Sequence, residues 1–268
     1  MSAHPAPPLN VRLRDGRRLA YDDVGDPTGV AVLYFHGGGD SRLTRHPNDA
    51  VAEEAGVRLI AVDRPGCGWS DPRPERLLVE WAVDVDQLAD TLGLERFSVL
   101  GWSSGGPHAL ACGRVLRGRV DRAVVVAGLP EPQGFRLLPR DLQLTLRLAR
   151  RDPRLVLAPL ARWGRRPPAR TCDADCDQAY AEGRVEAFRQ GSLGLAWELH
   201  ALACGWGFRP EEIRVPVSLW YGAQDRVCPA DIGRDLARRI PGASLTVVDD
   251  GHQLLFSRWR DLLAELTR

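Results

Sequence analysis

Residues 97–106 read Phe97-Ser98-Val99-Leu100-Gly101-Trp102-Ser103-Ser104-Gly105-Gly106. Strand-forming residues lead into the pattern Gly-x-Ser-x-Gly, and small residues able to begin a helix follow it. A serine in such a sharp strand-to-helix turn projects its hydroxyl above the sheet, and glycines are needed because a Cβ would collide there. The following helix directs free backbone N–H groups toward whatever lies beside Ser103. The alternative is an ordinary Gly/Ser turn, and the rest of the chain decides between the two.

The composition is ordinary for a globular protein with a substantial core, built as one domain or as one domain with an insertion. The 268 residues are 44% hydrophobic and 26% charged, and the net charge is +1. This charge gives no reason to expect nucleic acid or a membrane as a partner. All 36 basic residues are arginine. Without lysine there is no Schiff-base lysine, pyridoxal phosphate anchor or P-loop lysine, and we expect no cofactor.

The cysteines predict a reducing environment. Six are scattered through a chain large enough to fold without disulfides, which indicates free thiols and a cytoplasmic location. Cys172 and Cys176 are spaced like half a metal site, but no second Cys/His pair completes it, so we expect neither a metal nor a disulfide there. Residues 1–8 are rich in proline and alanine without an apolar core, so we expect an irregular start rather than a signal peptide.

Buried strands alternate with amphipathic helices along most of the chain. Turn chemistry at Asp15-Gly16 predicts an antiparallel pair of strands at the start. Continuous apolar runs then predict strands buried on both faces of a mostly parallel sheet. Beyond the elements around Ser103, the expected strands are 30–35, 58–62, 120–129, 215–221 and 244–248, and the expected helices are 50–56, 75–93, 229–240 and 254–266. The alternation predicts an open α/β sheet whose ligands bind beyond the carboxyl ends of its strands.

A helical insertion interrupts this alternation. Residues 131–210 show helical stripes without a convincing strand, which predicts a cap inserted after the sixth strand, with 1–130 and 211–268 forming the core. The segment 130–170 holds ten arginines against three acidic residues. A solvated basic face is the simpler interpretation, and binding of a carboxylate or another anion is the alternative.

Three polar residues follow strands in the order Ser103, Asp225, His252, which is the order of the α/β-hydrolase triad. The chain resembles the α/β-hydrolase fold superfamily, in the branch with a helical cap that includes serine esterases and relatives of proline iminopeptidases. The motifs that carry the resemblance are His36-Gly37-Gly38, the loop Asp63–Ser70, the turn at Ser103, Gly222-x-x-Asp225-x-x-x-Pro229 and Gly251-His252.

The resemblance implies a role for each of these residues. Ser103 would be the nucleophile, His252 the general base, and Asp225 the acid that orients the imidazole. The N–H groups of Gly38 and Ser104 would form an oxyanion hole. Glu131 follows the sixth strand, where some relatives keep the acid, and it is the alternative to Asp225.

Other residues near these motifs have weaker assignments. We expect Gly37, Trp102, Trp197 and His200 to contact the substrate. His36 and His108 are better explained as buried structural histidines. His36 would lie under the glycine-rich loop, Gly37-Gly38-Gly39, and His108 would lie on the helix after Ser103.

Some families in the superfamily fit poorly. Proline iminopeptidases follow His-Gly-Gly with Pro-Gly, whereas this chain has Gly39-Asp40. Epoxide hydrolases and haloalkane dehalogenases use an aspartate nucleophile, which Ser103 replaces. Lipases typically show export signals or large apolar surfaces, and neither is visible in the sequence.

The sequence therefore predicts a serine hydrolase that cleaves a small, largely apolar ester, thioester, lactone or amide through an acyl-enzyme. The alternative is a lyase, acyl transferase or cyclase that uses the same three residues without net hydrolysis. A non-catalytic receptor is a third interpretation, but a receptor has no use for all three. The expected partner is a small-molecule substrate, and a homodimer is left open.

Overall fold

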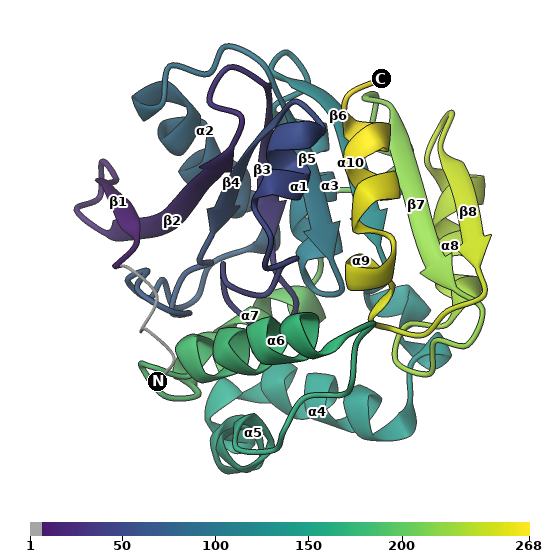
Figure 1. The fold of residues 1–268 in the computed structure, drawn as a ribbon. Helices are drawn as coiled ribbons and strands as arrows, with labels where there is room; N and C mark the ends of the chain where they lie inside the picture. Colours follow the sequence, from purple (N-terminus) through teal and green to yellow (C-terminus); the bar gives the residue numbers. More distant parts are fainter. Residues whose placement is uncertain (1–6) are drawn as a thin grey trace.

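The computed structural model describes residues 7–268. Its centre is one eight-stranded sheet in the order β1-β2-β4-β3-β5-β6-β7-β8 (Figure 1). Strand β2 runs antiparallel to both of its neighbours, and every other pairing is parallel. The strands are β1 Leu9–Arg12, β2 Arg18–Gly25, β3 Val30–Phe35, β4 Val57–Val62, β5 Phe97–Trp102, β6 Val120–Val126, β7 Val217–Gly222 and β8 Ser244–Val248. The predicted opening hairpin and mostly parallel sheet are confirmed.

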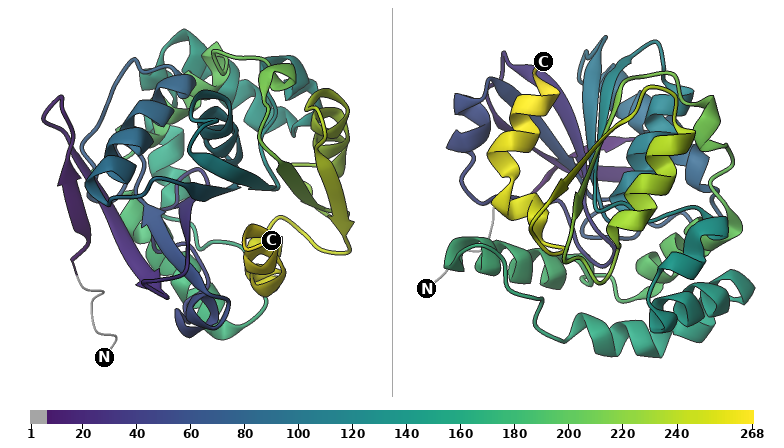
Figure 2. Two further views of the ribbon diagram at one scale, coloured as in Figure 1. Left: turned by 90° about the horizontal axis from the view of Figure 1, so that it is seen from above. Right: turned by 90° about the vertical axis from the view of Figure 1, so that its right-hand side faces the viewer.

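Helices cover both faces of the sheet, as seen from above in Figure 2. One face carries α1 (Ala50–Glu54), α9 (Leu254–Ser257) and α10 (Trp259–Leu266), and the other carries α2 (Trp81–Thr91), α3 (Gly105–Val115) and α8 (Ala230–Arg239). Because both faces are covered, the central strands are mostly apolar. All six residues of β5 are buried.

The strand register places the expected motifs at the same edge of the sheet. In the parallel pair β3–β5, Phe35 lies opposite Gly101. The two strands therefore end side by side, and the loop after Phe35 meets the turn at Ser103. Each of the expected motifs follows a strand of this parallel set, so all of them emerge at its carboxyl edge.

Between β6 and β7 the chain is helical and crosses the carboxyl ends of the strands, in the lower part of Figure 1. Its helices are α4 (Arg140–Arg151), α5 (Leu157–Gly164), α6 (Ala174–Ala187) and α7 (Leu193–Cys204), with 3₁₀ turns at Pro132–Leu137, Pro153–Val156 and Pro210–Glu212. This agrees with the predicted helical insertion after the sixth strand. All ten arginines of 130–170 are exposed, as expected for a solvated basic face.

Three predicted elements differ from the structure in ways described below, and several others differ only by one or two residues at their ends. The helix predicted over 75–93 begins as a 3₁₀ turn at Leu78–Glu80, because the Glu80 carboxylate accepts the N–H of Leu77 at 2.7 Å and caps it. The strand predicted over 120–129 ends at Val126, because Ala127 has a φ of 46° that a strand does not tolerate. The last helix is interrupted at Arg258, which separates α9 from α10.

Two other features of the chain bear on its environment. Within residues 7–268, no helix is both long and apolar enough to cross a bilayer. All six cysteines are free thiols. The prediction of an irregular N-terminal start falls largely on residues 1–6, which lie outside the described residues.

Candidate active site

The turn after β5 holds Ser103 in a strained backbone conformation. Its φ of 53° lies in the left-handed region, which a non-glycine residue adopts only when its surroundings impose it. The N–H of Ser103 donates to the carbonyl of Val126 at 2.8 Å and anchors the turn to β6. A Cβ at Gly105 would lie 2.1 Å from the carbonyl oxygen of Phe35, so only glycine allows α3 to begin against the end of β3.

A continuous line of hydrogen bonds joins three side chains that the sequence analysis singled out. The Nε2 of His252 lies 3.1 Å from the Oγ of Ser103, and its Nδ1 lies 2.8 Å from the Oδ2 of Asp225. The other carboxylate oxygen of Asp225 accepts the N–H groups of Val227 at 2.7 Å and Cys228 at 2.8 Å. The carboxylate is thus held at both oxygens, and it keeps the proton of a neutral imidazole on Nδ1, with Nε2 free to accept from Ser103.

The alternative acid, Glu131, is occupied elsewhere. Its carboxylate pairs with Arg239 of α8, and this pair is part of the packing between the insertion and the core.

The expected oxyanion groups lie beside Ser103. Ser104 precedes α3, and Gly38 lies in the loop after β3. A Cβ at Gly38 would be 3.4 Å from the Oγ of Ser104, so the loop and the turn face each other closely. Within residues 7–268, neither N–H group donates to a protein acceptor, which leaves both free for a ligand oxygen.

Gly37 does not face open space. Its own Cβ position would lie 2.5 Å from the Oδ2 of Asp40 and 3.0 Å from the ring of Trp102, so it is enclosed between them. Its carbonyl accepts from Arg64. These contacts explain a glycine at this position by packing.

The other three expected substrate contacts, Trp102, Trp197 and His200, also have protein partners in the structure. Trp102 is only 1% exposed, and its indole Nε1 donates to the carbonyl oxygen of His252 at 3.0 Å. Its ring lies 5.4 Å from the imidazole of His252, centre to centre. Trp197 and His200 pack against each other on α7, and the Nδ1 of His200 bonds to the carbonyl of Ala149 on α4. Trp102 therefore supports His252, and His200, against which Trp197 packs, connects α7 to α4.

Two histidines have buried positions with backbone partners. His36 bonds through Nδ1 to the carbonyl of Gly37, and His108 bonds through Nδ1 to the carbonyl of Ser104. Burial lowers the pKa of both rings well below the ordinary value, so both stay neutral. Each ring is bonded to one of two segments, the loop that carries Gly38 and the turn that carries Ser104, which form the two walls of the expected oxyanion site.

Comparison with known proteins identifies the family of this chain. The family model described as alpha/beta hydrolase fold matches residues 30–258. The chain belongs to the alpha/beta hydrolase fold family. A curated relative from Pseudomonas putida, named 2-hydroxy-6-oxononadienedioate/2-hydroxy-6-oxononatrienedioate hydrolase 2, is 28% identical over 262 residues, covering 90% of this chain and 88% of that protein.

Solved structures share the fold of this α/β hydrolase. An esterase from Exiguobacterium antarcticum aligns with a TM-score of 0.74 and 21% identity, covering 97% of both chains. The enol-lactonase from Burkholderia xenovorans LB400 aligns with a TM-score of 0.74 and 20% identity, covering 96% of this chain and 97% of that one. These three proteins are by name a hydrolase, an esterase and an enol-lactonase, and this chain is an enzyme of the same fold.

Two ion pairs in which both side chains are at most 6% exposed join the helical insertion of the hydrolase to its core, and sequence reasoning missed both. Arg64, after β4, pairs with Glu198 of α7, and both side chains are 0% exposed. Arg184 of α6 pairs with Asp40 in the loop after β3. A signal for the first existed, because Glu198 is the one acidic residue in the otherwise apolar sequence Leu193–Cys204.

The Arg184–Asp40 pair lies over the glycine-rich loop and is poorly bonded. The Nε of Arg184 is 3.5 Å from the Oδ1 of Asp40, and within residues 7–268 neither atom has a hydrogen-bond partner of good geometry. The guanidinium stacks 3.9 Å above the ring of Trp163, which in turn touches Gly39. Burial raises the pKa of Asp40 to about 6, although Arg184 opposes the rise. The buried guanidinium of Arg184 thus makes only long polar contacts, at 3.5 Å to Asp40 and at 3.4 Å from its Nη2 to the Oη of Tyr180.

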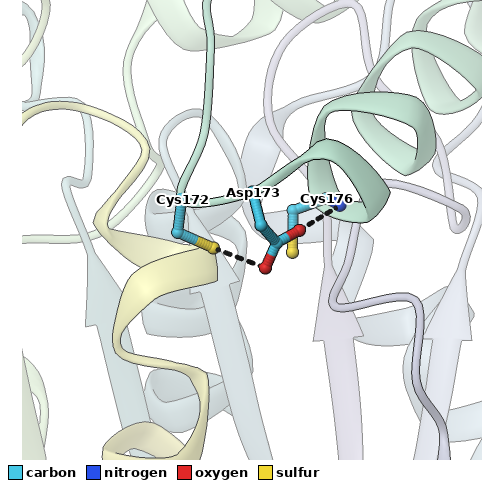
Figure 3. Close-up of side chains that lie close together, drawn as sticks. All are labelled: Cys172, Asp173 and Cys176. Carbon is cyan, nitrogen blue, oxygen red and sulfur yellow. Dashed lines mark hydrogen bonds between the residues drawn. The ribbon is translucent and has the colours of Figure 1, made fainter.

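The two cysteines singled out by their spacing come together at the start of α6 (Figure 3). The thiol of Cys172 donates to Asp173, whose other oxygen accepts the N–H of Cys176 at 2.8 Å and caps the helix. Burial raises the pKa of the Cys172 thiol. These contacts are those of a capped helix start, with thiols that stay protonated.

Proposed function

We propose that this α/β hydrolase cleaves a small carboxylic ester or lactone through an acyl-enzyme on Ser103. The observation that carries the proposal is the continuous hydrogen-bonded line Ser103–His252–Asp225, with distances of 3.1 and 2.8 Å. A serine hydroxyl is a weak nucleophile at neutral pH, and an adjacent imidazole held in the correct tautomer activates it.

In the proposed reaction, Ser103 Oγ attacks the carbonyl carbon while His252 Nε2 takes its proton. The N–H groups of Gly38 and Ser104 stabilise the negative charge on the carbonyl oxygen. His252 then returns the proton to the leaving oxygen, and the acyl group remains on Ser103. Water, activated by the same imidazole, releases the acid and restores the serine. Asp225 stabilises the imidazolium in both halves.

We also propose that the preferred substrate carries a carboxylate beside an apolar body. Arg184 supports this, because it is buried near the glycine-rich loop with a weak contact to Asp40. A substrate carboxylate would provide shorter charge-assisted hydrogen bonds than the contacts of 3.4 and 3.5 Å that this guanidinium makes to Tyr180 and Asp40. The rings of Trp163 and Tyr180 beside it offer apolar contact surface. The curated relative from Pseudomonas putida acts, by its name, on dioates, which are dicarboxylates.

The insertion would then act as a specificity cap. We propose the division into a core, 1–130 and 211–268, and a cap, 131–210, because the helices of the insertion cross the carboxyl ends of the strands where Ser103 lies. A cap there excludes water and strengthens the oxyanion interactions. The free cysteines support a cytoplasmic location. The proposed partner is a small molecule rather than nucleic acid or a membrane.

Labelling with a fluorophosphonate probe, together with hydrolysis of p-nitrophenyl esters, tests the reaction. We expect one label on Ser103, loss of label and turnover in Ser103→Ala, and no change in Ser192→Ala, which removes a serine hydroxyl from the insertion. Labelling at another residue would overturn the assignment. Labelling of Ser103 without hydrolysis of any neutral or carboxylate-bearing ester or lactone would favour the non-hydrolytic alternative.

A further inference from the structure

A single buried ion pair connects the insertion to both walls of the oxyanion site. Arg64 Nη2 lies 2.8 Å from Glu198 Oε1, and Arg64 Nε lies 3.1 Å from Glu198 Oε2. The pair is bidentate, the strongest geometry for an arginine and a carboxylate. Arg64 belongs to the loop after β4, whereas Glu198 lies on α7, 134 residues later.

The same guanidinium reaches the glycine-rich loop. It donates to the carbonyl oxygen of His36 and, at 3.1 Å, to the carbonyl oxygen of Gly37. The backbone N–H of Arg64 donates to Nε2 of His36 at 3.1 Å. These bonds orient the peptide units that lead directly to the N–H of Gly38, so Arg64 sets the direction of the first oxyanion donor.

The pair also holds the second donor. Arg64 Nη2 donates to Ser104 Oγ at 2.9 Å, and that hydroxyl donates to Glu198 Oε1 at 2.6 Å. The side chain of Ser104 is therefore fixed from two sides. Because Ser104 carries the other oxyanion N–H at the start of α3, its position depends on a carboxylate supplied by the insertion.

Stability alone does not account for this arrangement. Taking two charges out of water costs about as much as their attraction returns, and apolar residues of similar volume often stabilise a core as well. Removing only one partner leaves a buried charge uncompensated. The pair makes hydrogen bonds to both walls of the oxyanion site, which an apolar pair could not.

We propose that Glu198 is a positioning residue: through Arg64 and the Ser104 hydroxyl it aligns the N–H groups of Gly38 and Ser104 on one point. The role rests on the proposed function, in which that point is the carbonyl oxygen of the transition state. Oxyanion stabilisation is then complete only when α7 is docked on the core. Glu198 is not available to bind a substrate cation, because both of its oxygens are already bonded and its side chain is 0% exposed.

The test is Glu198→Gln, which keeps the shape and removes the charge. We expect kcat for a neutral p-nitrophenyl ester to fall about tenfold to a hundredfold with KM within threefold, because losing an oxyanion donor outright costs about 10²–10³ in kcat. Affinity for a boronic acid, which forms a tetrahedral adduct with the serine, should fall by a similar factor. Affinity for the acid product should stay within threefold.

Glu186→Gln is the matched control. Glu186 is also a carboxylate of the insertion that pairs with a buried arginine of the core, Arg42, at 2.8 Å. Arg42 bonds to Asp22 and Asp63 rather than to the oxyanion walls. We expect its kcat to stay within twofold of wild type. An equal loss of kcat in both variants would mean that any weakened contact between the insertion and the core lowers kcat. That result would overturn the specific role of Glu198.

Ser104→Ala provides a second route if Glu198→Gln does not fold. It should lower kcat threefold to tenfold with KM unchanged, and an unchanged kcat would overturn the proposal. If Glu198→Gln does fold, the double variant should lose less than the product of the two single losses, because both act through one hydrogen bond.

The two proposals fail in different ways. If wild-type Ser103 is labelled and turns over esters but Glu198→Gln keeps wild-type kcat, the positioning role is wrong and the proposed function stands. If wild type is neither labelled nor active, the proposed function is wrong. The amide ¹⁵N shifts of Gly38 and Ser104 then decide, because shifts unchanged in Glu198→Gln would overturn the positioning role as well.

Discussion

The indole Nε1 of Trp102 donates a hydrogen bond to the carbonyl oxygen of His252 at 3.0 Å. The residue that precedes the proposed nucleophile therefore holds the loop that carries the proposed base. The edges of Tyr180 and Phe256 pack against the same indole, with ring centres 5.6 and 6.1 Å away. Rotation of the imidazole away from Ser103 would require this aromatic group to move.

Replacing Trp102 with phenylalanine tests that support. Trp102→Phe keeps most of the ring and removes the N–H donor, whose net contribution is about 1 kcal/mol. We expect kcat to fall about threefold to tenfold with KM within twofold, measured with a p-nitrophenyl ester. Trp197→Phe, on α7, should be nearly silent. A raised KM with unchanged kcat would show that Trp102 contacts the substrate, as the sequence had predicted.

The acid is tested by comparing two carboxylates. Asp225→Asn should reduce kcat by about 10³–10⁴, because an amide no longer fixes the tautomer of His252. Glu131→Gln should change kcat less than twofold, because Glu131 pairs with Arg239. Steady-state kinetics of the two variants give the comparison. A larger loss of kcat in Glu131→Gln than in Asp225→Asn would mean that Glu131, after β6, is the acid of the triad.

The carboxylate preference is tested at Arg184. For an aryl monoester of a dicarboxylic acid, Arg184→Gln should lower kcat/KM at least tenfold relative to a neutral aryl ester of the same chain length. The buried guanidinium is the proposed partner of the free carboxylate. Arg162→Gln, at an exposed position of α5, should leave this ratio unchanged. A ratio that is equal in wild type and Arg184→Gln would exclude a carboxylate contact.

Asp40 should make stability depend on pH in a defined direction. Burial raises its pKa from 3.8 to about 6, so the folded protein holds a proton that the unfolded chain releases earlier. Stability due to this group is complete below about pH 4 and is lost as the pH rises through 6. A shift of this size corresponds to about 3 kcal/mol.

Urea unfolding of wild type and Asp40→Asn at pH 4 to 8 measures the effect. The free energy of unfolding of wild type should fall relative to the variant as the pH rises through this window. Asp63, whose pKa burial also raises to about 6, is present in both proteins and cancels in the difference. A difference that does not change with pH would contradict the prediction.

Local sequence patterns were sufficient to predict the architecture and the order of the proposed triad along the chain. The turn at Ser103 could be predicted because its glycines, the strand before it and the helix after it are contiguous in the sequence. The apolar runs predict buried strands whichever strands they pair with. Parallel strands place the residues that follow them at one edge of the sheet, which is why Asp225 and His252 could be expected beside Ser103.

The charged supports of the site were decided by tertiary structure. Arg64 and Glu198 are 134 residues apart, and although Glu198 stands out in an apolar segment, nothing in the sequence indicates which residue it pairs with. Helix α7 is apolar on nearly every side, so periodicity could not say whether Glu198, Trp197 or His200 faces the site. The sequence offers the arginines of 130–170 as candidates for anion binding, but they are exposed in the structure. Arg184, which lies outside that segment, is the arginine buried over the glycine-rich loop. Burial and pairing depend on which surfaces come into contact when the insertion packs on the core. A local sequence pattern contains no information about those contacts.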